Sequence, residues 1–568
     1  MRPWRATCAA LMAGLGAALY APTIRNGYTM DDFFVYARCG FVRSPAALRH
    51  LLTADYFRFS NEASYRPVVT LTYLADARLW REWSGGPHVT QIALFVAVLL
   101  LFHAAARKLL DNARAADLAA VLFAVHPIHH EVVASLSFRE DLLVPLFLLS
   151  SWLLYRRSRT ARSPAAAAGA FIAYGLALFS KESAAVYPAL FLLLQGLDRE
   201  PALRASRRGF WLHLAGLLAL TAGFALVRFR WLRHPGEAAV PALADDPLGM
   251  LAPLTKIQGR YLLLLLFPLR LRAFYPPSFY SSGLDAAFWL SALALAAVAA
   301  ALARWRRARP LAFGGAWWFA ALAPASNLYP LFNPMAERYL FLPSLGPCLA
   351  AGWAAARALA SRRGTAVRAA LITAAAAMAW GTWARHPVWR SDRTLWESAF
   401  AEAPEDPAVL ANLAAAEYEE GRYTNALVHA AAALRAAPRF SGRFNPGPAH
   451  LVHACSCYVL GRREQALVEA ERARSCTPMR SDLDAAVYNL VGRIHEDEKR
   501  FPEALEAYEH AARSDHFNAT AWRGVAICRL SLGRTQAAAE AWEKARALNP
   551  AMPAFARVLE VWEGVERP

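Results

Sequence analysis

The sequence contains little charge for its length. Only 19% of its 568 residues are Asp, Glu, Lys or Arg, while 57% are hydrophobic and the mean hydropathy is +0.22. An ordinary soluble protein of this size carries more charged residues, because polar groups must cover its surface. The composition therefore predicts a protein that crosses a membrane many times.

Signatures of several other protein classes are missing. The seven cysteines show no metal-ligand spacing, and the single C-x-C, Cys455 and Cys457, is a weak signal. We expect small core residues there, although a disulfide bridge in an oxidising compartment stays an alternative. The sequence also lacks a G-x-x-x-x-G-K-S/T loop, which would cradle nucleotide phosphates.

The net charge of +18 could indicate nucleic-acid binding. The arginines, however, gather in short segments between apolar runs, which is typical of the cytoplasmic loops of membrane proteins. We therefore interpret the charge as membrane topology and expect no nucleic-acid partner.

Eleven apolar runs are candidate membrane spans. They cover residues 6–22, 88–106, 115–128, 142–155, 165–179, 183–197, 209–227, 286–303, 311–323, 338–356 and 369–384. With the N-terminus in the cytoplasm, the predicted cytoplasmic loops hold many Arg and few acids, as the positive-inside rule requires. We expect the first run to be a retained helix and not a cleaved signal. The odd number of spans then places the C-terminal part outside.

Two other segments are not counted as spans. Residues 256–268 are predicted to form a re-entrant or interfacial helix, because counting them as a span would invert the topology of everything that follows. Residues 66–80 are mixed in character and are predicted to lie on the outer surface.

Internal repeats of about 34 residues follow the last span. Each has two amphipathic helical patterns and small residues at fixed positions, namely Ala426, Ala466, Ala504 and Ala538, then Ala433, Ala473, Ala511 and Ala545. Small side chains there let paired helices approach closely. We predict an all-α chain with a multi-spanning membrane domain (1–384), a linker (385–403) and a tetratricopeptide-repeat solenoid (404–568). A solenoid of this kind could merely brace the membrane domain, but we favour capture of a peptide or protein.

The residues that could carry chemistry lie in the predicted outer loops. Asp31 and Asp32 follow the first span among aromatic and apolar neighbours, which favours a packed position over a solvated one. A carboxylate there could accept a proton from an acceptor hydroxyl or bind a divalent cation.

Histidines and an acid follow the third span. His126, His129 and His130 with Glu131 suggest zinc ligands, but their H-P-x-H-H-E order does not match H-E-x-x-H. We favour orientation of a polar headgroup or hydrogen bonding at a helix end. No metal site is predicted, and a divalent cation stays an open alternative.

Three cations on the same predicted face could stabilise a phosphate leaving group: Arg139, Lys181 and Arg338. Alternatively, each could pair with a neighbour in sequence, Arg139 with Glu140 or Asp141, Lys181 with Glu182, and Arg338 with Glu337. Their shared location favours a site.

Together these motifs resemble a known family. The Asp31–Asp32 pair, "HPIHHEVVAS" followed by "REDLL", "SKES", "AERYLFLPSLG" and the terminal repeats are similar to the transmembrane and tetratricopeptide-repeat O-mannosyltransferases and their bacterial relatives, a branch of the GT-C glycosyltransferases. The likeness covers almost the whole chain. It implies a GT-C type membrane domain and a polyprenyl- or dolichyl-phosphate-linked sugar, mannose favoured. It also implies inverting transfer to a Ser or Thr hydroxyl of a protein on the noncytoplasmic side.

The resemblance also implies roles for individual residues. Asp31 or Asp32 would be the catalytic acid residue, with Asp32 slightly preferred as the base. The donor phosphate would contact Arg139, Lys181 and Arg338, and the pocket would be shaped by His126, His129, Glu131, Asp141, Glu182 and Glu337. The family usually has a Gly-Arg-Ala-Asp-like segment where this chain reads Ser137 to Asp141, so the donor sugar stays open.

Two other classes remain alternatives. A transporter or flippase of lipid-linked saccharides would place charges in mid-span, whereas these spans are nearly free of Asp, Glu and Lys. A noncatalytic scaffold would leave the outer acids and cations without a role. The Ala- and Arg-rich usage suggests a GC-rich bacterium, and thus an inner membrane with periplasmic repeats. In a eukaryote the equivalent would be the endoplasmic reticulum membrane with lumenal repeats.

Overall fold

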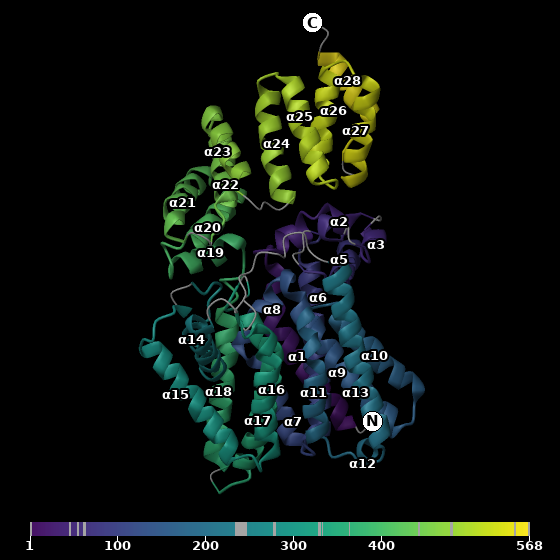
Figure 1. Ribbon diagram of the computed structural model, residues 1–568, viewed down its shortest axis with the longest axis vertical. Coiled ribbons are helices and arrows are strands. Elements are labelled where there is room, and N and C mark those ends of the chain that lie inside the picture. The colour runs from purple at the N-terminus through teal and green to yellow at the C-terminus, as the bar shows by residue number, and fades with distance from the viewer. Residues whose placement is uncertain are drawn as a thin grey trace. The chain divides into compact units, whose positions relative to one another are not determined.

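The computed structural model describes residues 3–44, 47–53, 56–60, 64–232, 247–276, 280–327, 331, 333–362, 364–440, 444–476, 481–549 and 552–565. All regular structure in these residues is helical, as predicted (Figure 1). The chain divides into two compact units. The membrane unit comprises Met1–Asp32 and Ser64–Ser391, and the repeat unit comprises Phe33–Ala63 and Asp392–Pro568.

Each predicted span corresponds to a helix of the membrane unit. These helices are α1 (Pro3–Tyr20), α6 (Gly86–Leu109), α7 (Ala113–Val125), α9 (Arg139–Thr160), α10 (Pro164–Leu178), α11 (Tyr187–Leu197), α13 (Arg207–Leu226), α15 (Ala286–Arg304), α16 (Arg309–Leu322), α17 (Phe341–Leu359) and α18 (Gly364–Ala384). Several of them begin at polar N-caps, because the side-chain oxygen satisfies a backbone N–H in the first turn. Asn112, Ser163, Ser206 and Asp285 cap α7, α10, α13 and α15 in this way.

Length and composition mark five of the described helical segments as able to cross a membrane. They are Thr7–Arg25, Gly86–Leu109, Arg207–Trp231, Ala286–Arg304 and Glu337–Leu359. Pro164–Leu178 and Glu182–Leu197 are apolar but shorter. Large apolar side chains on these and neighbouring helices are exposed, among them Trp211, Trp289, Leu293 and Trp380. Exposed groups of this size suit contact with lipid and not with water.

The two uncounted segments are also helical. Residues 66–80 contain α5 (Pro67–Trp80), and all but the last two of residues 256–268 belong to the longer helix α14 (Pro247–Leu266). Lys256 of α14 bonds Asp285 at 2.7 Å, the residue that caps α15.

The loops at the two ends of the helices of the membrane unit differ in their residues. At one end, Arg156 pairs with Asp198 at 3.0 Å and with Glu200 at 2.5 Å. The other end carries short helices, namely η3 (Pro127–His129), α8 (His130–Ala134), η4 (Leu136–Phe138), η5 (Glu182–Val186) and η11 (Glu337–Leu340). These short turns hold most of the residues predicted to be functional.

The repeat unit contains antiparallel helix pairs (Figure 1). They are α20 (Pro407–Glu419) with α21 (Tyr423–Ala436), α22 (Gly447–Val459) with α23 (Arg463–Ser475), α24 (Ser481–Asp497) with α25 (Phe501–Ser514), and α26 (Ala519–Ser531) with α27 (Thr535–Leu548). Before them lies α19 (Asp392–Phe400), and after them α28 (Phe555–Val565). The eight alanines predicted at packing positions are all fully buried. Their small side chains set the close spacing of each pair.

The repeat unit also includes a segment from the connection between α1 and α5, which the sequence did not predict. This segment holds the π-helix η2 (Phe33–Ala37), α2 (Gly40–Arg43), α3 (Ala47–His50) and α4 (Tyr56–Phe59). Phe41 is fully buried, with its ring 5.6 Å from that of Phe517. A Cβ on Gly40 would stand 2.6 Å from the Phe517 carbonyl oxygen, so the close approach requires glycine.

Candidate functional site

Asp32 is a buried residue of the loop that follows α1. Its Oδ1 accepts hydrogen bonds from Ser135 Oγ at 2.8 Å and from the Ser137 amide at 2.7 Å, while Oδ2 accepts one from the Thr29 amide at 3.1 Å. The side chain is inaccessible to solvent, and burial raises the pKa of its carboxyl above the usual value despite these bonds. Asp32 therefore joins the loop after α1 to the turn before α9.

Asp31, the adjacent residue, is exposed. It follows Met30, whose φ of 52° is left-handed and costs a non-glycine residue about 1 kcal/mol. The bonds of Asp32 to Thr29 close this turn and hold it in place. Of the two predicted acids, Asp31 is the one that a ligand can reach without rearrangement of the loop.

The Arg139 side chain is fully buried, and neighbouring side chains accept its hydrogen bonds. Its Nη2 lies 2.6 Å from Asp76 Oδ2, and its Nε donates to Gln91 Oε1 at 2.7 Å. The guanidinium also lies 4.8 Å from the centroid of the Tyr73 ring. With no exposed surface and a carboxylate in contact, Arg139 braces α5, α6 and α9 and does not face a ligand in this conformation.

Lys181 belongs to a group of charges at the start of α9. Its Nζ lies 2.6 and 2.7 Å from the two oxygens of Asp141 and 3.6 Å from Glu140 Oε1. Arg66 also donates to Glu140, at 2.9 Å. About one eighth of the Lys181 and Asp141 side chains is exposed, so this group borders an accessible surface.

Arg338 completes the charged group. Its Nη1 donates to Glu131 Oε1 at 2.5 Å, and its backbone amide donates to Glu131 Oε2 at 2.8 Å. The guanidinium stacks near Phe138 and Tyr339, with ring centroids at 4.3 and 4.9 Å. Tyr339 also lies 5.8 Å from Lys181 Nζ, so its ring connects the two cations.

The pairings between sequence neighbours are not the ones the structure contains. Arg139 pairs with Asp76, Lys181 with Asp141, and Arg338 with Glu131. Glu182 instead binds Arg228 at 3.2 Å, and Glu337 accepts hydrogen bonds from the Arg272 amide at 2.5 Å and from Tyr275 Oη at 2.9 Å. Each of these bonds joins different loops, which sequence neighbours cannot do.

The predicted histidines bind backbone and hydroxyl groups. His126 Nε2 lies 2.9 Å from the Leu265 carbonyl oxygen, and its Nδ1 accepts from the Ile128 amide at 3.4 Å. His129 lies 2.9 Å from both the Phe123 carbonyl oxygen and Ser344 Oγ. Within the described ranges, no three His, Cys, Asp or Glu residues are arranged to hold a metal ion.

The structure thus forms two ion pairs, Glu131 with Arg338 and Asp141 with Lys181, which the Tyr339 ring connects. Asp32 bonds the turn before α9, and Arg139 begins α9. Reasoning from the sequence missed Arg66 and Tyr339 as members of the group. The signal for Tyr339 was its position beside Arg338. Arg66 stands far from the other motifs and gave none.

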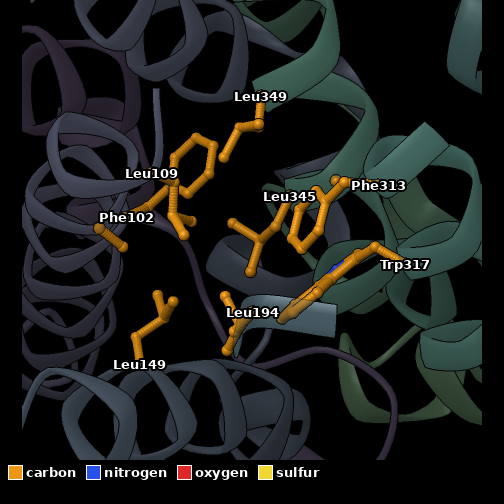
Figure 2. Close-up of a pocket in the computed structure, with 10 residues that line it drawn as sticks. Phe102, Leu109, Leu149, Leu194, Phe313, Trp317, Leu345 and Leu349 are labelled. Carbon is orange, nitrogen blue, oxygen red and sulfur yellow. The ribbon is translucent and has the colours of Figure 1, made fainter. Parts of the chain in front are cut away.

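An apolar cavity lies deeper in the helix bundle. It is lined by side chains from α6, α9, α11, α16 and α17. Figure 2 shows Phe102 and Leu149 opposite Phe313 and Trp317, with Leu194 and Leu345 between them. Leu149 follows Asp141 along α9 by about 12 Å of helix. The cavity and the charged group therefore share α9, and α17 follows directly after the turn that bears Arg338.

Comparisons with known proteins identify similar chains. The family described as dolichyl-phosphate-mannose-protein mannosyltransferase matches residues 84–227. Protein O-mannosyl-transferase F38B6.6 of Caenorhabditis elegans is 24% identical over 422 residues, covering 71% of this chain and 59% of that protein. Human protein O-mannosyl-transferase TMTC1 is 32% identical over 160 residues, covering 27% of this chain and 18% of its own length. The chain thus spans less than two thirds of either relative.

Solved structures align with a smaller part of the chain. The protein MamA aligns with 28% of this chain and 87% of its own at 14% identity and a TM-score of 0.24. YrrB, described as a TPR protein with an unusual peptide-binding site, aligns with 28% at 18% identity and a TM-score of 0.23. Similarity at this level carries no argument about function. The sequence relatives, by contrast, confirm the resemblance noted from the motifs.

Proposed function

Because this integral membrane protein is a relative of the transmembrane and tetratricopeptide-repeat O-mannosyltransferases, we propose that it transfers a sugar, mannose favoured, from a polyprenyl-phosphate carrier to a Ser or Thr hydroxyl of a protein. The single observation that carries this proposal is the charged group of Lys181, Asp141, Arg338 and Glu131 beside an accessible acid loop. Transfer would occur on the noncytoplasmic face, with inversion at the anomeric carbon.

Asp31 is the better candidate for the general base. A base must come within hydrogen-bond reach of the hydroxyl whose proton it takes. Asp31 is exposed, whereas the oxygens of Asp32 already accept hydrogen bonds from Thr29, Ser135 and Ser137. The slight preference for Asp32 made from the sequence is therefore reversed in this proposal, and Asp32 becomes the residue that positions Asp31.

In the proposed reaction, the acceptor oxygen attacks the anomeric carbon as the bond to the donor phosphate breaks. The hydroxyl proton passes to Asp31, and the electron pair of the broken bond stays on the departing polyprenyl phosphate. Lys181 and Arg338 would stabilise that negative charge, Lys181 as a point charge and Arg338 through its planar guanidinium. Their carboxylate partners, Asp141 and Glu131, hold both cations in place before the donor binds.

The apolar cavity supports a lipid-linked donor. All of its lining is apolar, and it shares α9 with the charged group. An isoprenoid chain whose phosphate lies at Lys181 would reach it along that helix. The repeats would present the acceptor protein, since paired-helix solenoids supply extended binding surfaces.

Transfer of radiolabelled mannose tests this function. The purified full-length protein, reconstituted in lipid, is given polyprenyl-phosphate-mannose and cell-envelope proteins, with GDP-mannose as the control donor. We expect acid-stable label on Ser and Thr from the lipid donor and none from the nucleotide donor. Absence of label with mannose, glucose and other lipid-linked sugars would favour the transporter or scaffold instead.

A further inference from the structure

The guanidinium of Arg385 is buried, and only part of its hydrogen-bonding capacity is used within the described residues. It follows α18, and about nine tenths of its side chain is buried. Its Nη1 donates to the Leu271 carbonyl oxygen at 2.7 Å. Its Nε and Nη2 are buried and have no hydrogen-bond partner among the described residues.

These two nitrogens form the edge of a guanidinium that binds oxyanions. Nε and the adjacent Nη donate two parallel hydrogen bonds, which match two oxygens of a carboxylate or phosphate. Buried donors almost always have an acceptor, because leaving one unpaired costs about 1–3 kcal/mol. An unpaired edge on a charged group is therefore a feature that calls for a ligand.

Glu337 is the nearest carboxylate, yet it does not fill this edge. Its Oε2 lies 3.6 Å from Arg385 Nη2, beyond hydrogen-bond distance, and has no donor of its own. Its Oε1 accepts the two bonds from Tyr275 and Arg272. Glu337 is thus held away from Arg385 by other elements of the fold.

Three other cations near the site lie closer to their carboxylate partners. The guanidinium of Arg338 lies 2.5 Å from Glu131, Lys181 lies 2.6 Å from Asp141, and Arg139 lies 2.6 Å from Asp76. Arg385 has only the looser contact. It also joins the site directly, since Glu337 precedes Arg338 in η11.

Further unpaired donors and acceptors surround the same place. Trp389 Nε1 and His130 Nδ1 are buried without hydrogen-bond partners in the described structure, and the two rings lie 6.4 Å apart. His130 precedes Glu131, the partner of Arg338. The dipeptides His130–Glu131 and Glu337–Arg338 therefore each place one side chain in the charged group and the other beside Arg385.

We propose that the Nε–Nη2 edge of Arg385 binds a phosphate oxyanion, that of the lipid-linked donor. This assignment rests on the proposed function and adds to it a phosphate-binding residue outside the predicted membrane domain. Glu337 then acts as a positioning residue that keeps the edge open. The proposed phosphate site adjoins η11, the turn that also bears Arg338.

Binding of farnesyl phosphate tests this assignment, because it needs no sugar transfer. The full-length protein in nanodiscs is titrated with farnesyl phosphate, farnesol and inorganic phosphate, and ligand binding is followed by the rise in unfolding temperature. Arg385→Gln is compared with Arg385→Lys. The control is Arg228→Gln, since Arg228 already donates to Glu182 and to the Leu232 carbonyl oxygen.

We expect Arg385→Gln to weaken farnesyl phosphate binding by about tenfold or more, the effect of losing a charged bidentate bond. Arg385→Lys should bind with intermediate affinity, because it keeps the charge and loses the fork. Farnesol binding and the control variant should match the wild type. Equal farnesyl phosphate affinity in folded Arg385→Gln or Arg385→Lys and in the wild type overturns the proposal.

Two other outcomes are decisive. Binding of inorganic phosphate as tight as that of farnesyl phosphate would overturn the assignment to a lipid donor and leave a free-anion site. No binding of farnesyl phosphate to the wild type would overturn it completely. Arg385-dependent binding of farnesyl phosphate without any sugar transfer would contradict the proposed function and still support the phosphate site.

Discussion

Lys181 Nζ lies 2.6 and 2.7 Å from the two carboxylate oxygens of Asp141, a residue forty positions earlier in the chain. This contact joins the end of α10 to the start of α9 at the most polar part of the site. It holds a cation where a phosphate could reach it, and it makes the two residues depend on one another.

Removing one member of this pair should destabilise the protein more than removing both. Asp141→Asn leaves a largely buried ammonium without its carboxylate, which costs up to several kcal/mol. In the double variant Lys181→Met/Asp141→Asn, most of that loss should be recovered, giving a coupling energy of about 1–3 kcal/mol. Unfolding temperatures of the four proteins in nanodiscs measure it. Additive losses would show that the contact contributes nothing.

Asp32 should make stability depend on pH. Burial raises the pKa of its carboxyl in the folded protein, so the folded state favours the protonated form. Its contribution is then fully present below the unfolded value of about 3.9 and is lost as the pH rises through the folded-state pKa. The difference in unfolding temperature between wild type and Asp32→Asn should grow in favour of the wild type as the pH falls. A difference independent of pH from 4 to 8 would contradict this.

Gly40→Val should disrupt the contact between α2 and the turn before α26. The new Cβ would lie 2.6 Å from a backbone oxygen of Phe517, which no rotamer change relieves, and overpacking of this kind costs about 1–3 kcal/mol. Hydrogen exchange should increase in residues 33–44 and 515–518. Gly14→Ala, which meets no atom within 4 Å, is the matched control and should exchange like the wild type.

Lys499→Gly should stabilise the repeat unit. Lys499 has a φ of 59° where the first, second and fourth repeats have Gly421, Gly461 and Gly533 at 77°, 79° and 74°. A left-handed conformation costs a residue with a Cβ about 1 kcal/mol, and glycine avoids this cost. The gain should appear as a higher denaturation midpoint of the repeat unit. Gly461→Ala should lower it by a similar amount.

The features that depend on local sequence patterns, namely the repeats and the helices, could be predicted. The alanine spacing identified the repeats, since these positions must be small for helices to pair, and all eight are buried. The apolar runs identified the helices, because hydropathy reports the surroundings of each segment directly. The acids and cations of the candidate site could be identified because their motifs lie between the apolar runs.

Contacts between loops that are far apart in the chain could not be predicted from the sequence. Nothing in "NGYTMDDFFVY" distinguishes Asp31, which is exposed, from Asp32, which Ser135 and Ser137 bind more than a hundred positions away. The same holds for the segment from Phe33 onward, which packs with the repeats because of Gly40 and Phe41. Arg385 falls in the predicted linker, and its role in the proposed phosphate site rests on its unpaired nitrogens, which no sequence pattern shows.

Single-turnover transfer of labelled mannose from polyprenyl-phosphate-mannose, compared among wild type, Asp31→Asn and Asp32→Asn, tests the central claim most directly. Our account predicts that Asp31→Asn loses transfer by at least a hundredfold, the contribution of a general base, while donor binding and unfolding temperature stay unchanged. Asp32→Asn should retain measurable transfer and lose stability instead. Transfer by Asp31→Asn at the wild-type rate would contradict the account.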